Sequence, residues 1–405
     1  MIRKTTGCAL VALAAVVAAC APGPAPGGVL LITDTPAPTP APTPAPTPGT
    51  GLQATPSTAL ATIDQANAGD TVTFTTGSYP KLVLRKSFSS GRVTVKCQSG
   101  AVIAGVDSNG MSGYTFDGCR VSTPVEYTDI SKRAVEILGP SSNITWQNAT
   151  ITGGFIGWDI YGSSGQWAKN IRLVDSDVSL SGGDLIHTNG VDGLLIEHNN
   201  LHDPSHNASL GSASEHHDGW QPQNTTNATF TRNHVWWTSG TGHYTGTTGS
   251  YLGQGIMISG DGGAVQNVVI SNNLIEHYNG RPIDMVGAVG VKVVNNTLLD
   301  AGDGIGITVN GGSSAVEVWN NITTCVYGIG QTTYEANNWL INNAPCGGAA
   351  IDGQSAYHGD PALAPDYRPT ASSPVKGEGS TRTGTPTIDL DGATRSTPVL
   401  GARLG

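Results

Sequence analysis

A nine-residue pattern recurs eight times along this chain, and it limits the possible folds more than any other feature of the sequence. In each copy, two alternating apolar positions are followed by a polar pair and a further apolar residue. The copies begin at Gly113, Asn143, Asn170, Gly193, Asn227, Asn267, Gly290 and Ala315, so their starts are 23 to 40 residues apart. One copy is too short to bury its own apolar face. Neighbouring copies must therefore stack on one another, as they do in a solenoid.

The seventh position of the pattern repeatedly carries asparagine. Five copies have it, at Asn199, Asn233, Asn273, Asn296 and Asn321. Asparagine both donates and accepts hydrogen bonds, so a column of these side chains inside the stack can satisfy the buried backbone of the turns. We therefore assign the asparagines to structure and not to catalysis. The short repeated strands and this column together predict a parallel β-solenoid.

The composition agrees with many short strands joined by tight turns. Glycine contributes 55 of the 405 residues and charged residues only 12%, which disfavours both long helices and a charge-rich disordered chain. Acidic residues outnumber basic ones by 30 to 20, so the formal net charge is −10. We expect no basic surface for nucleic acid. No oligomer interface is recognisable in the sequence, and we expect a monomer.

The spacing of the copies and the asparagine column resemble those of right-handed parallel β-helix proteins of the pectate lyase type, over about residues 57–350. The resemblance implies an all-β fold, a single-stranded right-handed parallel β-helix, over residues 51–350. The run that begins at Ala59 is similar to the N-terminal capping helix of secreted β-helices, with Leu60, Ile63 and Ala66 at helical spacing. Residues 351–405 resemble the irregular C-terminal cap of bacterial surface β-helix proteins.

The first 50 residues are expected to form a leader and a tether. Arg3 and Lys4 precede an apolar run that ends at Cys20, which is the layout of a secretory signal peptide. The four residues ending at Cys20 resemble the lipobox of bacterial lipoproteins, which implies removal of residues 1–19 and lipidation of the Cys20 sulfur; an ordinary signal peptide is the alternative. Residues 20–50 would then form the lipidated end and a Pro/Thr/Ala-rich tether. We expect an exported protein, attached to the bacterial cell envelope only by its lipid, in the outer membrane if the host is Gram-negative.

Four cysteines of the expected β-helix test the register. Cys97 and Cys119 lie six residues after Gly91 and Gly113, which places them at one position of successive coils. Adjacent strands are about 4.8 Å apart, which suits the Cα separation of a disulfide, about 4.4 to 6.8 Å. We predict the disulfides Cys97–Cys119 and Cys325–Cys346, formed in an oxidising compartment.

A second set of strand-like segments follows the copies, for example at 155–162, 184–190 and 217–223. Alternation places their isoleucines and Trp220 inward, so the residues between them point outward. One outward column comprises Asp159, His187, Gln221, Met257, Asp284 and Gly306. The next comprises Tyr161, Asn189, Gln223, Ser259, Val286 and Thr308. The residues just before these strands are Asp184, His217, Asp218, Gln254 and Arg281.

Two long insertions, at 202–217 and 236–253, leave the stack between a copy of the pattern and the next second-set segment. Both should therefore rise on one side of the outward columns. Long loops of a compact solenoid usually carry function. Their aromatic residues are expected to form walls on which sugar rings stack: Trp236, Trp237, Tyr244 and Tyr251.

The segment Asp218 to Asn224 resembles the Tyr-Gly-Phe-Asp-Pro-His-Asp motif of mannuronan C5-epimerases, which are also parallel β-helices. Gly219, Trp220 and Pro222 match the motif. The Asp and His that carry the chemistry in that family fall on Gln221 and Gln223, and glutamine cannot act as a general base. The resemblance thus implies the fold and the position of a site, but not the epimerase mechanism.

The outward polar residues favour proton-transfer chemistry on an acidic polysaccharide. A lyase or epimerase needs a base, an acid, and groups that neutralise the sugar carboxylate. His187 and Tyr161 are candidates for the first two roles, and Arg281 and the side-chain amides for the third. The residues expected to contact substrate are Asp159, Asn189, His217, Trp220, Gln221, Gln223, Gln254, Asp284, Trp236 and Tyr244.

Two alternatives stay open from the sequence. Asp184 and Asp218 are the candidates for paired carboxylates in a glycoside hydrolase, and a non-catalytic polysaccharide-binding protein or adhesin would need no catalytic group. No cofactor is indicated by a motif. The oxygen atoms of Asp159, Asp184, Asp218 and Asp284 are ligands that suit calcium.

Overall fold

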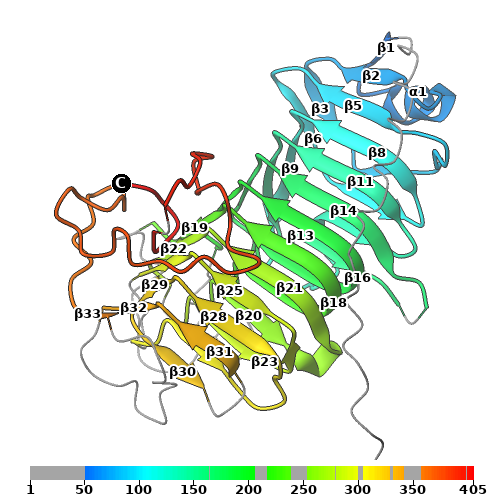
Figure 1. Cartoon of the computed structure of the whole chain (residues 1–405). Coiled ribbons are helices and arrows are strands. Elements are labelled where there is room, and N and C mark those ends of the chain that lie inside the picture. The colour runs from blue at the N-terminus through cyan, green and yellow to red at the C-terminus, as the bar shows by residue number, and fades with distance from the viewer. Residues whose placement is uncertain are drawn as a thin grey trace, which may run out of the picture. The chain divides into compact units, whose positions relative to one another are not determined.

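The computed structural model describes residues 51–163, 165–205, 217–238, 253–278, 280–299, 304–328, 332–341, 357–397 and 399–405. Three sets of parallel strands wind into a right-handed β-helix (Figure 1). Along each coil a template strand is followed by a third-set strand and then by a second-set strand, which leads into the next template strand. The fold predicted from the repeated pattern is confirmed.

The template strands carry the repeated pattern and its equivalents in the first coils. They are β1 (Gly51–Ala54), β2 (Thr71–Phe74), β5 (Val93–Cys97), β8 (Ser112–Asp117), β11 (Ser142–Gln147), β14 (Ala168–Val174), β21 (Val265–Ser271), β24 (Ala288–Val289), β25 (Lys292–Val294), β28 (Val316–Trp319) and β31 (Thr332–Ala336). Two strands of 12 residues, β16 (Ile186–Glu197) and β18 (Trp220–Thr231), pass through a second-set position and then a template position without a break.

In the described residues, the second-set strands hydrogen-bond into the same sheet as the template strands, which has 21 strands there. Besides the first halves of β16 and β18, they are β4 (Leu82–Val83), β7 (Val106–Asn109), β10 (Arg133–Leu138), β13 (Ile156–Tyr161), β20 (Ile256–Ser259), β23 (Ile283–Val286), β27 (Ile307–Val309) and β30 (Val326–Gly328). A short 3₁₀ turn, η2 (Gly260–Gly262), follows β20.

The third-set strands form a separate sheet, with 12 strands in the part of the chain that the structure describes, and the sequence pattern did not distinguish them from turns. Most are only two or three residues long, too short for alternation to be recognised. They are β3 (Gly77–Tyr79), β6 (Ala101–Ile103), β9 (Arg120–Val125), β12 (Thr150–Gly154), β15 (Asp177–Ser179), β17 (Asn200–His202), β19 (His234–Trp236), β22 (Leu274–Glu276), β26 (Thr297–Leu298), β29 (Ile322–Thr323), β32 (Trp339–Leu340) and β33 (Tyr357–His358).

The predicted asparagine column lies inside the turn between the template and third-set strands. The side-chain amide of each member donates to the next side-chain oxygen, at 2.9 to 3.2 Å. The ladder runs through Asn199, Asn233, Asn273, Asn296 and Asn321 and ends at Asn338, which the pattern had not included. The residue before each of the six has a positive φ of 54° to 58°, so the turn repeats without change from coil to coil. The structural role predicted for these asparagines is confirmed.

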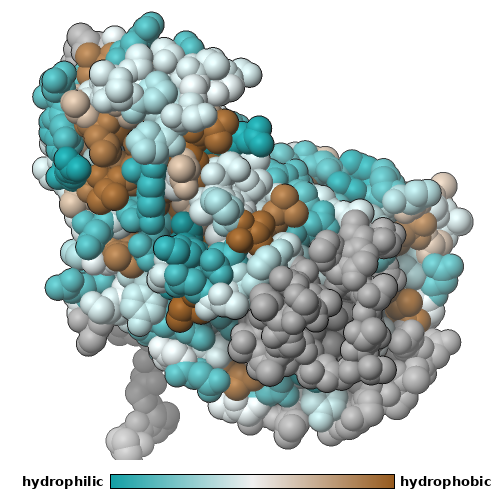
Figure 2. All heavy atoms as spheres, turned by 180° about the vertical axis from the view of Figure 1, so that it is seen from behind, coloured by the Kyte–Doolittle hydropathy of each residue, from teal (hydrophilic) through white to brown (hydrophobic). Residues whose placement is uncertain are grey.

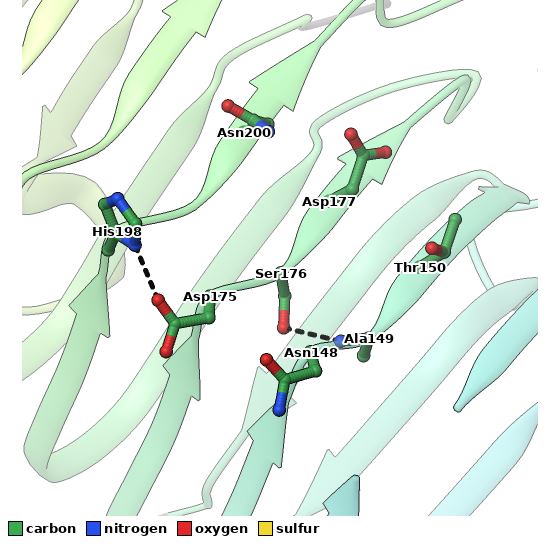
Figure 3. Close-up of a pocket in the computed structure, with 8 residues that line it drawn as sticks. All are labelled: Asn148, Ala149, Thr150, Asp175, Ser176, Asp177, His198 and Asn200. Atoms are coloured by element: carbon green, nitrogen blue, oxygen red, sulfur yellow. Dashed lines mark hydrogen bonds and ion pairs between the residues drawn. The ribbon is translucent and has the colours of Figure 1, made fainter. Parts of the chain in front are cut away.

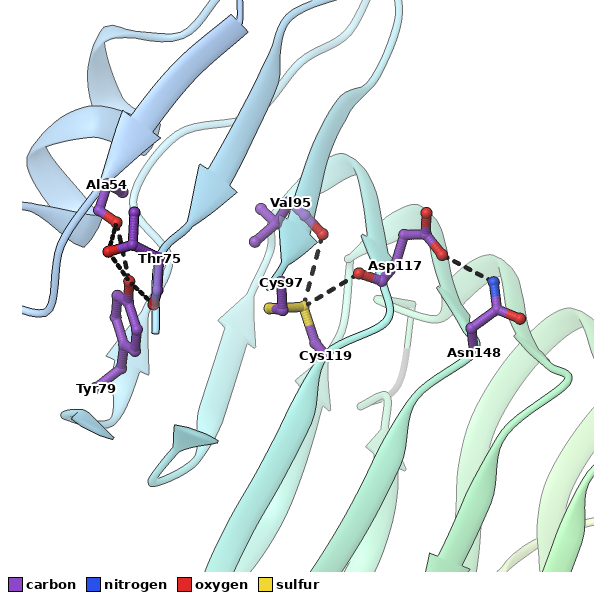
Figure 4. The surroundings of a disulfide bond; sticks show 8 residues. All are labelled: Ala54, Thr75, Tyr79, Val95, Cys97, Asp117, Cys119 and Asn148. Carbon is purple, nitrogen blue, oxygen red and sulfur yellow. Dashed lines mark hydrogen bonds between the residues drawn. A yellow bond between two sulfur atoms is a disulfide. The ribbon is translucent and has the colours of Figure 1, made fainter. Parts of the chain in front are cut away.

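The disulfide Cys97–Cys119 is present, with a Cα separation of 4.8 Å (Figure 4). It joins the end of β5 to the turn after β8, as the register predicted. Cys325 is also disulfide-bonded. Its predicted partner, Cys346, lies outside the described residues.

We expect the double substitution Cys97→Ala/Cys119→Ala to lower the free energy of unfolding by about 3 kcal/mol. The bond closes a chain segment of 22 residues, and a loop of that length restricts the unfolded chain by about that amount. Chemical denaturation monitored by circular dichroism measures it. An unchanged midpoint and slope would show that the bond contributes nothing to stability.

The N-terminal end is covered by the predicted amphipathic helix, α1 (Ala59–Gln65). Ala59 and Ile63 face the core, and Ala66, directly after the helix, is also buried. Leu60 is partly buried against the same apolar core. The helix therefore closes the first coil by burying the spaced apolar residues that predicted it.

The described part of the C-terminal segment lies along the side of the later coils (Figure 1). Residues 376–399 run out and back, joined by antiparallel bridges between Ile388 and Thr394 and between Lys376 and Val399. In five successive coils, the residue just before the ladder asparagine donates a side-chain hydrogen bond to a main-chain carbonyl of this hairpin. These residues are Arg232, Asn272, Asn295, Asn320 and Asn337. These turn residues therefore have a second role, because they also attach the C-terminal segment.

The interior is one long apolar cluster with stacked aromatic rings, such as Phe116 on Trp146 with centroids 4.2 Å apart. The surface in Figure 2 is mainly hydrophilic, with a few apolar patches on the N-terminal coils. Within the described ranges, no helix is long and apolar enough to cross a membrane. The predicted leader, Cys20 and the predicted tether lie outside those ranges.

Candidate functional site

The second-set strands bring the predicted outward residues into one column across adjacent coils. Glu136 pairs in register with Asp159, Asp159 with His187, and His187 with Gln221. Further along, Met257 pairs with Asp284 and Asp284 with Thr308. The column therefore contains Thr308 where the sequence analysis placed Gly306, because the strand β27 starts two residues later than expected. The neighbouring column aligns Tyr161, Asn189 and Gln223, as predicted.

His187 and Asp159 form the central contact of this face. The Nδ1 atom of His187 lies 2.7 Å from Oδ1 of Asp159. A carboxylate can only accept, so Nδ1 carries the proton, and in the neutral ring Nε2 is the unprotonated nitrogen. The side chain of Asp159 is fully buried, whereas that of His187 is 13% exposed. Asp159 is thus inaccessible to a polymer, and its predicted role in substrate contact is wrong; it orients the histidine instead.

Arg133, at the start of β10, binds the other carboxylate oxygen of Asp159. Its Nε donates to Oδ2 of Asp159 at 2.6 Å and lies 3.6 Å from Oε1 of Glu136. The sequence analysis missed both Arg133 and Glu136. A signal was available for Glu136, which lies between the buried Val135 and Ile137, whereas the alternation does not place Arg133 on the outward face.

Two opposing effects act on the pKa of His187. Burial lowers this pKa, but the hydrogen bond to Asp159 and the negative charges of Asp159 and Asp184 raise it more, and the hydrogen bond to Gln223 adds to the increase. The net effect is a raised pKa. For Glu136, burial is the main cause of a raised pKa, which Arg133 partly offsets.

Amide groups and a tyrosine lie beside His187. Asn189 donates from Nδ2 to Oε1 of Gln223 at 3.1 Å. The turn η2 packs against Gln223 so closely that a Cβ atom at Gly262 would lie 2.5 Å from that Oε1. Tyr161 is 48% exposed and lies opposite Asn189 in the register. The cluster thus combines an imidazole, a hydroxyl group and fixed amides on one open face.

Arg281 and Asp284 form a second polar cluster. Nη1 of Arg281 lies 2.9 Å from Oδ2 of Asp284, whose Oδ1 accepts from Asn310 at 2.8 Å. Asp284 is three coils from His187, roughly 14 Å at about 4.8 Å per coil. The structure therefore does not bring Asp284 and His187 to one bond of a substrate. Arg281 forms an ion pair with Asp284.

Asp184 and Asp218 have a structural role that does not fit a catalytic pair. Oδ1 of Asp184 accepts the backbone N–H of Asp218 at 3.0 Å, and Oδ1 of Asp218 accepts that of Gln254 at 2.7 Å. Both side chains belong to buried residues. They connect successive coils in the same way as the asparagine ladder, and the hydrolase pair proposed from the sequence is not supported.

Three predicted substrate contacts lie elsewhere. Trp220 is fully buried and stacks on Phe230 in the core. His217 is 3% exposed and packs edge to face against Trp237. Trp236 belongs to the third-set sheet, where its ring stacks on those of His202 and His234. Burial contradicts the contacts predicted for Trp220 and His217. Trp236 is partly exposed, but β19, which carries it, lies in a sheet that the sequence did not reveal. Tyr244 and Tyr251 lie outside the described residues.

The carboxylates suggested for calcium do not fit that ion. Asp159 and Asp284 bind arginine, and Asp184 and Asp218 accept backbone N–H groups. In the part of the chain that the structure describes, no group of three or more His, Cys, Asp or Glu side chains could hold a metal ion.

A shallow pocket of about 370 Å³ lies on another face, at the turns between template and third-set strands (Figure 3). It is lined by Asn148, Ala149, Thr150, Asp175, Ser176, Asp177, His198 and Asn200. In this pocket, Nδ1 of His198 lies 2.5 Å from Oδ1 of Asp175, and both side chains are about half exposed to solvent. A half-exposed pair is strongly screened by water, so this pocket lacks the buried, orienting carboxylate of the His187 site.

Comparison with solved structures identifies the fold. Pectate lyase Pel9A matches 85% of this chain and 90% of its own, with a TM-score of 0.53 and 15% identity. XylC in complex with xylose matches 67% of each chain, with a TM-score of 0.50 and 10% identity. The A-module of mannuronan C-5 epimerase AlgE4 from Azotobacter vinelandii covers 75% of this chain and 91% of its own, with a TM-score of 0.43 and 11% identity. No family model and no curated protein matches the chain. At these identities the likeness shows the β-helix fold alone.

Proposed function

We propose that this protein cleaves or epimerises an acidic polysaccharide by proton transfer at the His187 face. One observation carries the proposal: a fully buried carboxylate, Asp159, holds Nδ1 of a partly exposed histidine. Such an arrangement fixes the ring with its proton on Nδ1, so that Nε2 of the neutral ring is the nitrogen that takes a proton of the substrate. Support also comes from the pectate lyase whose fold covers 85% of this chain.

The reaction begins with removal of the C5 proton of a uronic acid unit by neutral His187. The electron pair of that C–H bond moves into the carboxyl group, and Asp159 stabilises the imidazolium that forms. Asn189, Gln221 and Gln223 donate N–H groups to the sugar carboxylate, where negative charge develops. In a lyase the C4–O bond then breaks, a C4=C5 double bond forms, and Tyr161 protonates the leaving oxygen. In an epimerase a proton returns to C5 from the opposite side.

The raised pKa of His187 sets the pH dependence. The base works only when neutral, so kcat/KM should rise with pH through the pKa of His187 and fall as the ring becomes protonated. Because Asp159 raises that pKa, the acid limb should lie above the ordinary value for histidine. In Asp159→Asn the limb should move to lower pH. A pH profile of kcat/KM measures both positions, and identical acid limbs in the two proteins would contradict the role of Asp159.

We also propose that the protein is exported and anchored at the cell envelope through Cys20, as a monomer with the β-helix outside the cytoplasm. The Cys97–Cys119 disulfide is typical of an oxidising compartment and supports export. Metabolic labelling with a radioactive fatty acid tests the anchor. Label in the wild-type chain and none in Cys20→Ser is expected; equal label in both excludes lipidation at this residue.

The function is tested by incubating the purified protein with a panel of acidic and neutral polysaccharides, with and without calcium. A lyase shortens the polymer and produces unsaturated ends that absorb ultraviolet light, whereas an epimerase changes the sugar configuration seen by NMR without shortening the chain. Retention of a polysaccharide without either change would show a binding protein or adhesin and would overturn the catalytic proposal. Saturated reducing ends would show a hydrolase instead.

A further inference from the structure

The contact between His187 and Asp159 belongs to a row of charges that crosses three successive coils. Arg133 lies between two carboxylates, 2.6 Å from Asp159 and 3.6 Å from Glu136. The Arg133 side chain is 18% exposed and that of Glu136 is 20% exposed. Within the described part of the chain, Arg133 and His187 are the ion-pair partners of Asp159. Arg133 is thus the permanent cation beside a buried anion.

We infer that Arg133 is a positioning residue, which holds Asp159 in line with His187 and offsets part of the charge of that carboxylate. The inference rests on the proposed function, in which His187 transfers the proton. A buried carboxylate needs a paired cation, and neutral His187 cannot supply that charge. By holding Oδ2, Arg133 supplies this charge and leaves Oδ1 aligned with Nδ1 of His187.

The sign of the effect on the pKa follows from the charges. Arg133 neutralises part of the negative potential that Asp159 exerts on the imidazole. Removing this cation leaves the imidazolium as the remaining ion-pair partner of Asp159 in the described structure, so the pKa of His187 should increase. The increase expected is about one unit, a tenfold change in the protonation equilibrium. More of the enzyme would then be protonated, and inactive as a base, at neutral pH.

The experiment is a pH titration of the protein labelled with ¹⁵N-histidine, followed by NMR, in wild type and in Arg133→Met. In wild type, neutral His187 should carry its proton on Nδ1. In Arg133→Met, the pKa should rise and the Nδ1 proton should exchange faster with water. Where the variant can be assayed, kcat should fall while KM changes little, because the substrate-binding amides are untouched.

A matched control and a conservative variant separate positioning from general damage. Arg232 has the same 18% side-chain exposure and pairs with Glu197 at 3.3 Å, in the turn between template and third-set strands. Arg232→Met should therefore leave the His187 titration unchanged. Arg133→Lys keeps the charge but loses the Nε contact, so the pKa should stay near wild type while the Nδ1 proton exchanges faster. It also provides the measurement if Arg133→Met does not fold.

The inference and the proposed function fail separately. If no polysaccharide is altered by wild type, the function falls, whereas the NMR titration still measures the coupling. A folded Arg133→Met or Arg133→Lys protein with the wild-type tautomer and Nδ1 exchange rate would overturn the positioning role. Equal shifts in Arg133→Met and Arg232→Met would overturn it too, because the effect would then be nonspecific.

Discussion

His187→Ala should reduce kcat/KM on the true polysaccharide by about 10²–10⁴-fold, which is the usual contribution of a positioned acid–base group. The substitution removes the atom that takes the substrate proton but leaves Asp159 paired with Arg133. The fold should therefore survive. The initial rate of product formation measures the loss, and circular dichroism confirms that the variant is folded.

The chain offers a matched control for this prediction. His198 also pairs through Nδ1 with an aspartate, Asp175, but this pair is about half exposed and lies on the turns between template and third-set strands. His198→Ala should leave the rate unchanged. Full activity in His187→Ala would remove His187 from the mechanism, and equal losses in both variants would point to a shared structural effect.

The asparagine ladder and the outward column could be predicted because each depends on a short local rule. The ladder follows from one position of a repeated pattern, and the alignment of Asp159, His187 and Gln221 follows from alternation within second-set strands. The same rule placed Trp220 inward, and the structure stacks it on Phe230. Its expected contact with substrate did not follow from the alternation.

Other features of the site depend on contacts that a local pattern does not contain. Arg133 reaches Asp159 across 26 residues of sequence, and nothing near Arg133 identifies that partner. Alternation showed that Asp159 points outward, but it did not show that Arg133 and His187 cover it completely. The third-set strands are too short to be recognised, so the sequence could not separate the face that carries Trp236 from the face that carries His187.

The buried ladder leads to a second large effect, this time on stability. Asn199→Leu should lower the free energy of unfolding by about 2–6 kcal/mol. The substitution leaves two buried backbone groups without a hydrogen-bond partner, and each such group costs about 1–3 kcal/mol. Oδ1 of Asn199 accepts the backbone N–H of Ser176 at 2.9 Å, and Nδ2 donates to the carbonyl of Leu173 at 3.0 Å. Leucine has a similar size but cannot make either bond.

The adjacent residue provides the control, because Asn199 is 2% exposed whereas Asn200 is exposed. Both substitutions replace asparagine by leucine at adjacent positions, so they share any general effect of an added apolar side chain. Asn200→Leu should change the unfolding midpoint little, and urea denaturation compares the two. If both variants lost equal stability, the ladder would not be the cause. A large loss in Asn199→Leu alone would mean that the repeated asparagine stabilises the coil against its neighbours, as its position in the pattern predicted.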